Sequence, residues 1–260
     1  MEVGVHGHII NYELLNSSLL ETNKTVLVFL HDGLGSIGQW KGIPQKLCDA
    51  VQLAGIVYDR HGYGLSINEG FDFKPGYFNE EAEIYLPEFL KKIGIQDNII
   101  LIGHSDGASI ALIFASCFPE KVKAIISEAA HVFTEEITLE GIRALKEKYG
   151  TDQNLSNNLK KYHTDQTSRL FNSWVDGWLS DTFKNWNIEE LLKNIKAPVL
   201  AIQGEEDEFT SIKQLEALKR NINTALTIHL LPDCRHFPHF EKETAVISLI
   251  QDFINQIITE

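Results

Sequence analysis

The chain has 260 residues, of which 43% are hydrophobic, and a formal net charge of −13, a length that suits one domain or one domain with an insertion. The acidic balance argues against a nucleic-acid partner, because such partners bind basic patches, and no apolar run is long enough to cross a membrane. The three cysteines are scattered and the amino end lacks the layout of a secretory signal, so we expect a cytoplasmic protein with reduced thiols and no zinc site.

Short apolar runs alternate with helical stretches along most of the chain. Residues 7–15 alternate enough to form an antiparallel hairpin at the edge of a sheet. Continuous apolar strands separated by helices predict a mostly parallel sheet that is covered on both faces. Six runs are predicted as its further strands: Thr25–Leu30, Leu53–Tyr58, Ile99–Ile102, Val122–Ser127, Val199–Gln203 and Leu226–Leu231.

Residues 131–196 interrupt this alternation, because they show helical patterns and no convincing strand. One helix is predicted over 139–149, and a second helix with a wide apolar stripe is predicted over 170–179. We therefore expect an all-helical insertion here, between the two parts of one core, 1–130 and 197–260.

The pattern Gly-x-Ser-x-Gly stands at residues 103–107, directly after one predicted strand and before a helix-compatible stretch. A strand that turns sharply into a helix strains the residue at the turn, so small neighbours are needed on both sides. The turn lifts the hydroxyl of Ser105 out of the sheet and aims the N–H of Asp106 at an oxyanion. Because the pattern also recurs as an ordinary small-residue turn, the hypothesis of a nucleophile needs partners for Ser105.

Partners for the serine are expected after later strands, because ligands of α/β sheets bind at the carboxyl ends of the strands. A serine nucleophile needs a base and a carboxylate that orients the base. The expected order of serine, acid and histidine favours Asp207, in the loop after Gly204, with Glu206 as the alternative acid. His236 is the favoured base, since it lies nearer its strand end than His239, which is expected to be structural or to line the pocket.

The second oxyanion donor is expected from the loop after the first main strand, His31–Gly35. Its two glycines let the backbone turn so that an N–H faces the serine. Gly33 is the first choice and Leu34 the second. We expect His31 and Asp32 to hold the loop and to take no chemical part.

Taken together, these motifs resemble the α/β-hydrolase superfamily. The resemblance implies an α/β-hydrolase fold, with a mostly parallel eight-stranded sheet, helices on both faces and a helical cap after strand six. Asp32 departs from the pattern, because many members have a glycine there, and this leaves open which N–H completes the oxyanion hole. The motifs span nearly the whole chain in family order: His31–Gly35, Asp59–Ser66, Gly103–Gly107, Gly204–Asp207 and His236 with Glu241.

Within the superfamily, Ser105–Asp106–Gly107 and the following cap are similar to the valacyclovir hydrolase-like branch, whose substrates are α-amino acid esters. A carboxylate beside the nucleophile could pair with the ammonium group of such a substrate. The competing interpretation is that Asp106 caps the helix or accepts local backbone hydrogen bonds. Trp174, Trp178 and His239 are further candidates for contact with substrate, although tryptophans in the insertion are also expected as packing residues.

The predicted function is a serine hydrolase that cleaves a small carboxylic ester, with an amino acid ester as one candidate, through an acyl-enzyme on Ser105. Such an enzyme needs a small acyl substrate as its partner and neither a metal nor an organic cofactor. A thioesterase, a lactonase or a C–C bond hydrolase with the same triad is an alternative, because cap residues decide the bond. A non-catalytic ligand-binding member of the fold is another alternative, and the oligomeric state stays open.

Overall fold

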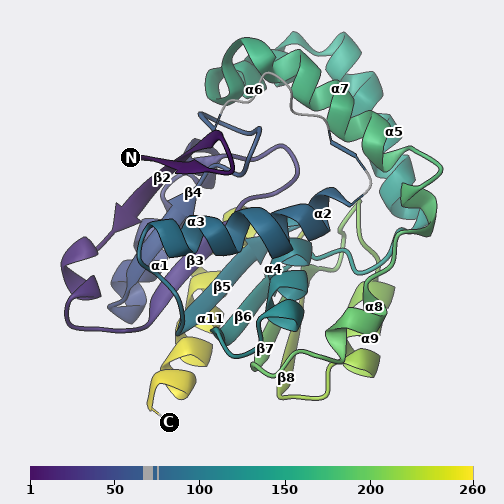
Figure 1. The fold of residues 1–260 in the computed structure, drawn as a ribbon. Coiled ribbons are helices and arrows are strands. Elements are labelled where there is room, and N and C mark those ends of the chain that lie inside the picture. The colour runs from purple at the N-terminus through teal and green to yellow at the C-terminus, as the bar shows by residue number, and fades with distance from the viewer. Residues whose placement is uncertain (67–72, 75, 260) are drawn as a thin grey trace.

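One sheet of eight strands runs through the molecule, in the order β1-β2-β4-β3-β5-β6-β7-β8 (Figure 1). The computed structural model describes residues 1–66, 73–74 and 76–259. Strands β1 and β2 pair antiparallel, as do β2 and β4, and all other neighbours are parallel. The prediction of a mostly parallel eight-stranded sheet is confirmed. The antiparallel edge hairpin is present, but residues 8–15 form only one of its strands and residues 2–5 form the other. The strands are β1 (Glu2–Val5), β2 (His8–Leu15), β3 (Val26–Leu30), β4 (Ala54–Tyr58), β5 (Ile99–His104), β6 (Val122–Glu128), β7 (Val199–Gly204) and β8 (Leu226–Leu231).

Alternate residues of the central strands point to opposite faces of the sheet and fill two hydrophobic cores. In β3, Leu27 and Phe29 join the core that α1 (Ile43–Val51) and α11 (Glu243–Thr259) cover. Val26, Val28 and Leu30 join the larger core on the other face. That second core is covered by α3 (Leu86–Lys92), α4 (Asp106–Cys117), α8 (Glu189–Leu192) and α9 (Ile212–Asn221).

Between β6 and β7 the chain forms a run of helices, of which α5, α6 and α7 lie together at one end of the sheet (Figure 1). Of these, α5 (Glu136–Thr151) contains the predicted segment 139–149, and α7 (Thr167–Trp178) covers the predicted segment 170–179 except its last residue. Helix α6 (Gln153–His163) was not predicted, because Leu155, Leu159 and Tyr162 give it only a thin apolar stripe among polar residues.

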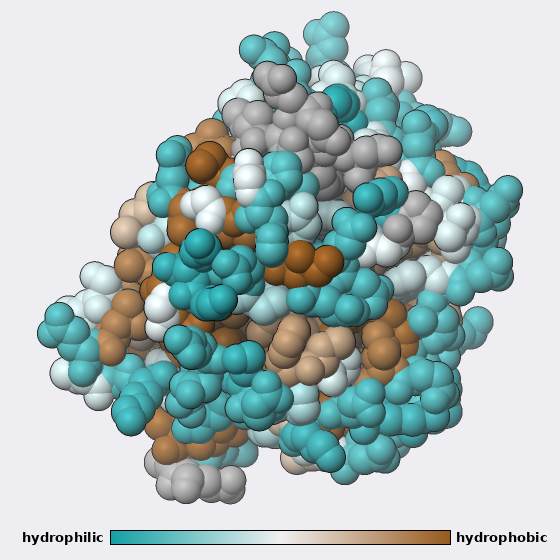
Figure 2. All heavy atoms as spheres, viewed as in Figure 1, coloured by the Kyte–Doolittle hydropathy of each residue, from teal (hydrophilic) through white to brown (hydrophobic). Residues whose placement is uncertain are grey.

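Short helices complete the described part of the chain. α2 (Tyr77–Glu80) continues into a π-helical turn at Glu81–Tyr85, and α10 (Pro238–Glu241) precedes α11. 3₁₀ turns lie at Ser17–Leu20, Ile37–Trp40, Thr164–Gln166 and Phe183–Asn185. Within the described residues, no helix is both long and apolar enough to span a membrane. Hydrophilic residues cover most of the face in Figure 2, with hydrophobic residues in separate patches between them.

Candidate active site

Ser105 stands on the sharp turn between β5 and α4, in a conformation that is strained for a residue with a side chain. Its φ of 53° lies in the left-handed region, with ψ at −119°. The turn requires glycine on both sides, because a Cβ on Gly103 would overlap the backbone of Gly107 and Ala108. A Cβ on Gly107 would overlap the carbonyl oxygen of Leu30 in the neighbouring strand. The turn therefore packs directly against the sheet and presents the Ser105 hydroxyl beyond the end of β5.

The structure brings Ser105, His236 and Asp207 into direct contact, although they lie after three different strands. His236 Nε2 lies 3.0 Å from Ser105 Oγ, and His236 Nδ1 lies 2.9 Å from each carboxylate oxygen of Asp207. The carboxylate is also held by its own loop, since Phe209 N–H and Thr210 N–H donate to Oδ1 at 2.8 and 3.0 Å. All three side chains of the group are buried, so their interactions are poorly screened by water. Glu206, the alternative acid, is exposed.

The charges of this group reinforce one another. Burial lowers the pKa of His236, but the Asp207 charge and the hydrogen bond to Asp207 raise it above its ordinary value. Burial raises the pKa of Asp207, but the His236 charge and the hydrogen bonds from His236 and Thr210 lower it overall. Asp207 is therefore held as a carboxylate that favours the imidazolium form of His236.

The loop after β3 carries Gly33 and Leu34 to the wall of the same cavity as Ser105. The fully buried Arg60 holds the backbone of this loop, because its Nη2 donates to Asp32 O at 2.6 Å. His163 of α6 holds the same loop at a second point, with Nε2 lying 2.8 Å from Leu34 O. Both candidate N–H donors thus sit on a loop that is fixed on two sides beside Ser105. Asp106, the third candidate donor, is the first residue of α4.

The side chain of Asp106 is fully buried and bonded to the protein. Its Oδ2 accepts a hydrogen bond of 2.9 Å from Nε1 of Trp174. Burial raises the pKa of Asp106 to about 6, and Arg60 opposes this shift. Asp106 is not among the residues that line the Ser105 cavity. One oxygen of this carboxylate is thus held by α7, whereas Oδ1 is buried without a hydrogen-bond partner among the described residues. Contact of Asp106 with a substrate ammonium stays a prediction.

Ser105 and His236 open onto a cavity of about 400 Å³ that lies between the sheet and the helices α5, α6 and α7. Trp174 and Trp178, two of the predicted contact residues, line it. His239, the third, lines an adjoining cavity instead, and its Nδ1 lies 2.9 Å from Glu128 Oε2 at the end of β6. Much of the lining is apolar, with Ile142, Ala144, Leu145, Leu155, Leu159, Trp174, Trp178, Phe209 and Phe237.

Two further histidines take positions that the sequence does not indicate. His104 Nε2 donates to the carbonyl oxygen of His236 at 2.7 Å, which holds the backbone of the base. His131 lines the cavity, and its ring lies 6.2 Å from that of His236. Burial, more than the charge of His236, lowers the pKa of His131 to about 3. A histidine inside Gly-x-Ser-x-Gly was the only available signal for His104, and its acceptor lies 132 positions further along the chain.

Known proteins with similar sequences are hydrolases. The family model described as alpha/beta hydrolase fold matches residues 25–173. The chain is 26% identical to the serine hydrolase BPHL of Homo sapiens over 223 residues, which is 83% of this chain and 72% of the relative. It is 25% identical to the 2-hydroxy-6-oxo-6-phenylhexa-2,4-dienoate hydrolase of Burkholderia cepacia, over 88% of this chain and 87% of the relative.

Among solved structures, an α/β hydrolase enzyme from a Medee basin deep-sea metagenome library superposes with a TM-score of 0.76 at 21% identity. The match covers 98% of this chain and 97% of the other. The family model matches more than half of the chain and the sheet has the expected eight strands. The chain therefore belongs to the α/β-hydrolase family and is an enzyme of the hydrolase class.

Proposed function

We propose that the protein is a serine hydrolase that cleaves small carboxylic esters through an acyl-enzyme on Ser105. The observation that carries the proposal is the continuous contact from Ser105 Oγ through His236 to Asp207. His236 accepts the hydroxyl proton as Ser105 attacks the acyl carbon, and Asp207 stabilises the imidazolium that forms. The N–H groups of Gly33 and Asp106 stabilise the oxyanion, with Leu34 as the alternative to Gly33. His236 then protonates the leaving alcohol and activates the water that releases the acid.

In this proposal, residues 131–196 act as a cap whose helices shape the acyl site. The apolar side chains of α5, α6 and α7 at the cavity favour a hydrocarbon acyl group, because its burial there removes apolar surface from water. Trp178 Nε1 and His131 Nδ1 are buried without a hydrogen-bond partner in the described part of the chain. They are the polar atoms that we assign to contact with substrate.

Hydrolysis of a carbon–carbon bond beside a ketone is the second candidate, with the same three residues. The identity with the Burkholderia cepacia dienoate hydrolase, over most of both chains, favours it. Turnover of 2-hydroxy-6-oxo-6-phenylhexa-2,4-dienoate, followed by its absorbance, distinguishes the candidates when esters are assayed in parallel.

The test is a panel of p-nitrophenyl esters, acyl thioesters and amino acid esters, assayed with the wild type and with Ser105→Ala. We expect turnover of at least one oxygen ester, and a loss of about 10³-fold or more in Ser105→Ala, because the nucleophile is removed. Ser18→Ala, at an exposed serine far from the site in a 3₁₀ turn, is the matched control and should keep the wild-type rate. Unchanged turnover in Ser105→Ala would refute the assignment.

A further inference from the structure

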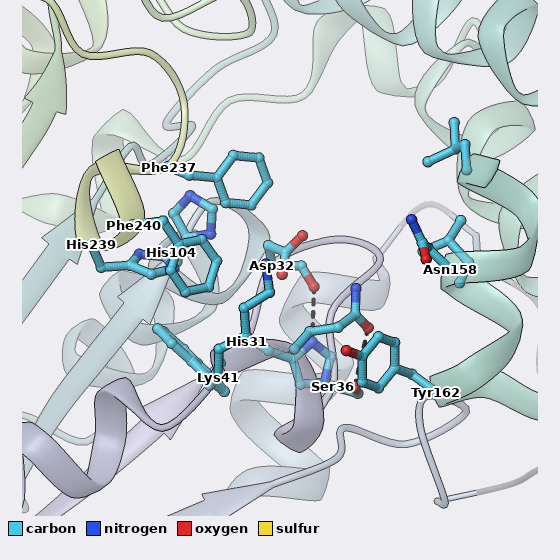
Figure 3. Close-up of a pocket in the computed structure, with 14 residues that line it drawn as sticks. His31, Asp32, Ser36, Lys41, His104, Asn158, Tyr162, Phe237, His239 and Phe240 are labelled. Atoms are coloured by element: carbon cyan, nitrogen blue, oxygen red, sulfur yellow. Dashed lines mark hydrogen bonds between the residues drawn. The ribbon is translucent and has the colours of Figure 1, made fainter. Parts of the chain in front are cut away.

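A second cavity, of about 430 Å³, adjoins the Ser105 cavity. The two share five lining residues, which form the wall between them: Asp32, Gln39, Leu155, Leu159 and Phe237. Figure 3 shows Asp32 in the middle of this second chamber, with Phe237 on one side and Asn158 and Tyr162 of α6 on the other. Asp32 therefore lines both the cavity of Ser105 and the compartment beside it.

The carboxylate of Asp32 is available to a ligand. The main chain of Asp32 is fixed, because its carbonyl oxygen accepts from Arg60 Nη2 at 2.6 Å and lies 2.8 Å from His31 Nδ1. The side chain is only half-buried, and within the described residues it accepts no hydrogen bond and forms no ion pair. A rigid backbone thus presents an unpaired negative charge on the wall that the two cavities share.

The other walls of the chamber suit an ammonium group. Four aromatic side chains line it, and the faces of such rings attract cations: Trp40, Tyr162, Phe237 and Phe240. The ammonium of Lys41 already lies 4.8 Å from the ring centroid of Phe240 at the exposed rim. Burial lowers the pKa of both His31 and His104, so these two lining residues add no positive charge near neutral pH. A carboxylate among aromatic rings is the composition that recognises alkylammonium ions.

The second chamber is lined by two neighbours of His236, whereas His236 itself lines the Ser105 cavity. His236 must protonate the leaving oxygen, so the leaving group lies on the His236 side of Ser105. Phe237 follows His236 and lines both cavities, and His104, which is bonded to the His236 carbonyl, lines the second one. The apolar Ser105 cavity is left for the acyl group.

We propose that the second chamber binds the alcohol portion of the ester, and that Asp32 selects substrates whose leaving alcohol carries an ammonium group. The inference rests on the proposed esterase function and adds a substrate class to it. It also changes the expected role of Asp32, which was predicted only to hold its loop. Arg60 and His31 act on the main chain of this loop, which leaves the Asp32 carboxylate for recognition.

The test compares two esters of one acyl group that differ only in charge, a choline ester and its neutral 3,3-dimethylbutyl isostere. In the wild type we expect kcat/KM to favour the choline ester by about five-fold, the upper scale of one partly exposed charge pair. In Asp32→Asn, which keeps the shape and removes the charge, this ratio should fall to about two or less, because only the attraction of the aromatic rings remains. The ratio cancels any general effect of the substitution on folding or on the chemical step.

Two further variants sharpen the test. Asp252→Asn removes the same charge from an exposed position of α11 and should leave the ratio at its wild-type value. Lys41→Met removes the competing cation at the rim and should raise the ratio of the two kcat/KM values. A fall in this ratio would show that the chamber does not favour a cation. The inference would be overturned by a wild-type ratio near one that stays the same in Asp32→Asn. Hydrolysis of the neutral ester in that case would still support the esterase function. Failure to hydrolyse either ester or any member of the panel would instead reject the proposed function.

Discussion

His236 is held at three points, and each restricts a different freedom of the ring. Nδ1 faces both oxygens of Asp207, Nε2 faces Ser105, and the backbone carbonyl is bonded to His104. Because the carboxylate accepts at Nδ1, the neutral ring carries its proton there and leaves Nε2 free to act as a base. The position of the histidine and its tautomer therefore both depend on interactions that the structure already contains.

Replacing Asp207 with Asn tests this arrangement through rate and pH together. We expect kcat to fall by about 10⁴-fold, because the amide favours the wrong tautomer and cannot stabilise the imidazolium. The Asp207 charge raises the pKa of His236, and the neutral base is lost as pH falls through that pKa. The acid limb of kcat/KM should therefore move to lower pH in Asp207→Asn, as measured from pH 5 to 9.

Glu206→Gln is the matched control, since Glu206 is the exposed neighbour of the buried acid. It should keep the wild-type rate and the wild-type pH profile. An equal loss of rate in both variants, or an acid limb that does not move in Asp207→Asn, would contradict the role given to Asp207.

At the scale of elements, the site depends on a close approach between the nucleophile turn and the sheet, and on two contacts from the helical insertion. Gly107 faces the carbonyl oxygens of Leu30 and His31 with no room for a side chain. His163 of α6 bonds to Leu34 O and accepts from Gly64 N–H, while Trp174 of α7 bonds to Asp106. The insertion is thus tied to the oxyanion loop and to the first turn of α4.

Gly107→Ala should destabilise the protein by about 1–3 kcal/mol, because its Cβ would overlap backbone that cannot move without shifting β3. Gly150→Ala, in α5 with open space around it, should instead stabilise by about 0.5–1 kcal/mol, since alanine favours a helix. Urea unfolding, followed by circular dichroism, measures both changes in the free energy of unfolding. Equal effects of the two substitutions would show that the approach at Gly107 is not tight.

At the scale of the whole molecule, the parallel sheet makes the site, because it brings the carboxyl ends of β5, β7 and β8 to one edge. Residues 105, 207 and 236 follow these ends, so apolar runs and turn motifs were sufficient to predict that they lie near one another. The sheet was predictable for the same reason, since each buried strand is a continuous apolar run.

Features that depend on how side chains from distant elements pack were beyond the sequence. The partner of the Asp106 carboxylate is Trp174, 68 positions away, and that of His239 is Glu128, 111 positions away. No local pattern records such pairs. The two cavities likewise form only where the loop after β3, the insertion and the segment after β8 meet. Helix α6 lines both cavities, but its thin apolar stripe was too weak to predict the helix.

The most direct measurement of the central claim is covalent labelling with a fluorophosphonate, followed by peptide mapping by mass spectrometry. An activated serine reacts with this reagent because its base removes the hydroxyl proton. We predict a single adduct on Ser105, which is absent in Ser105→Ala and forms far more slowly in His236→Ala. An adduct on a different residue, or labelling of Ser105 at an undiminished rate in His236→Ala, would contradict the account.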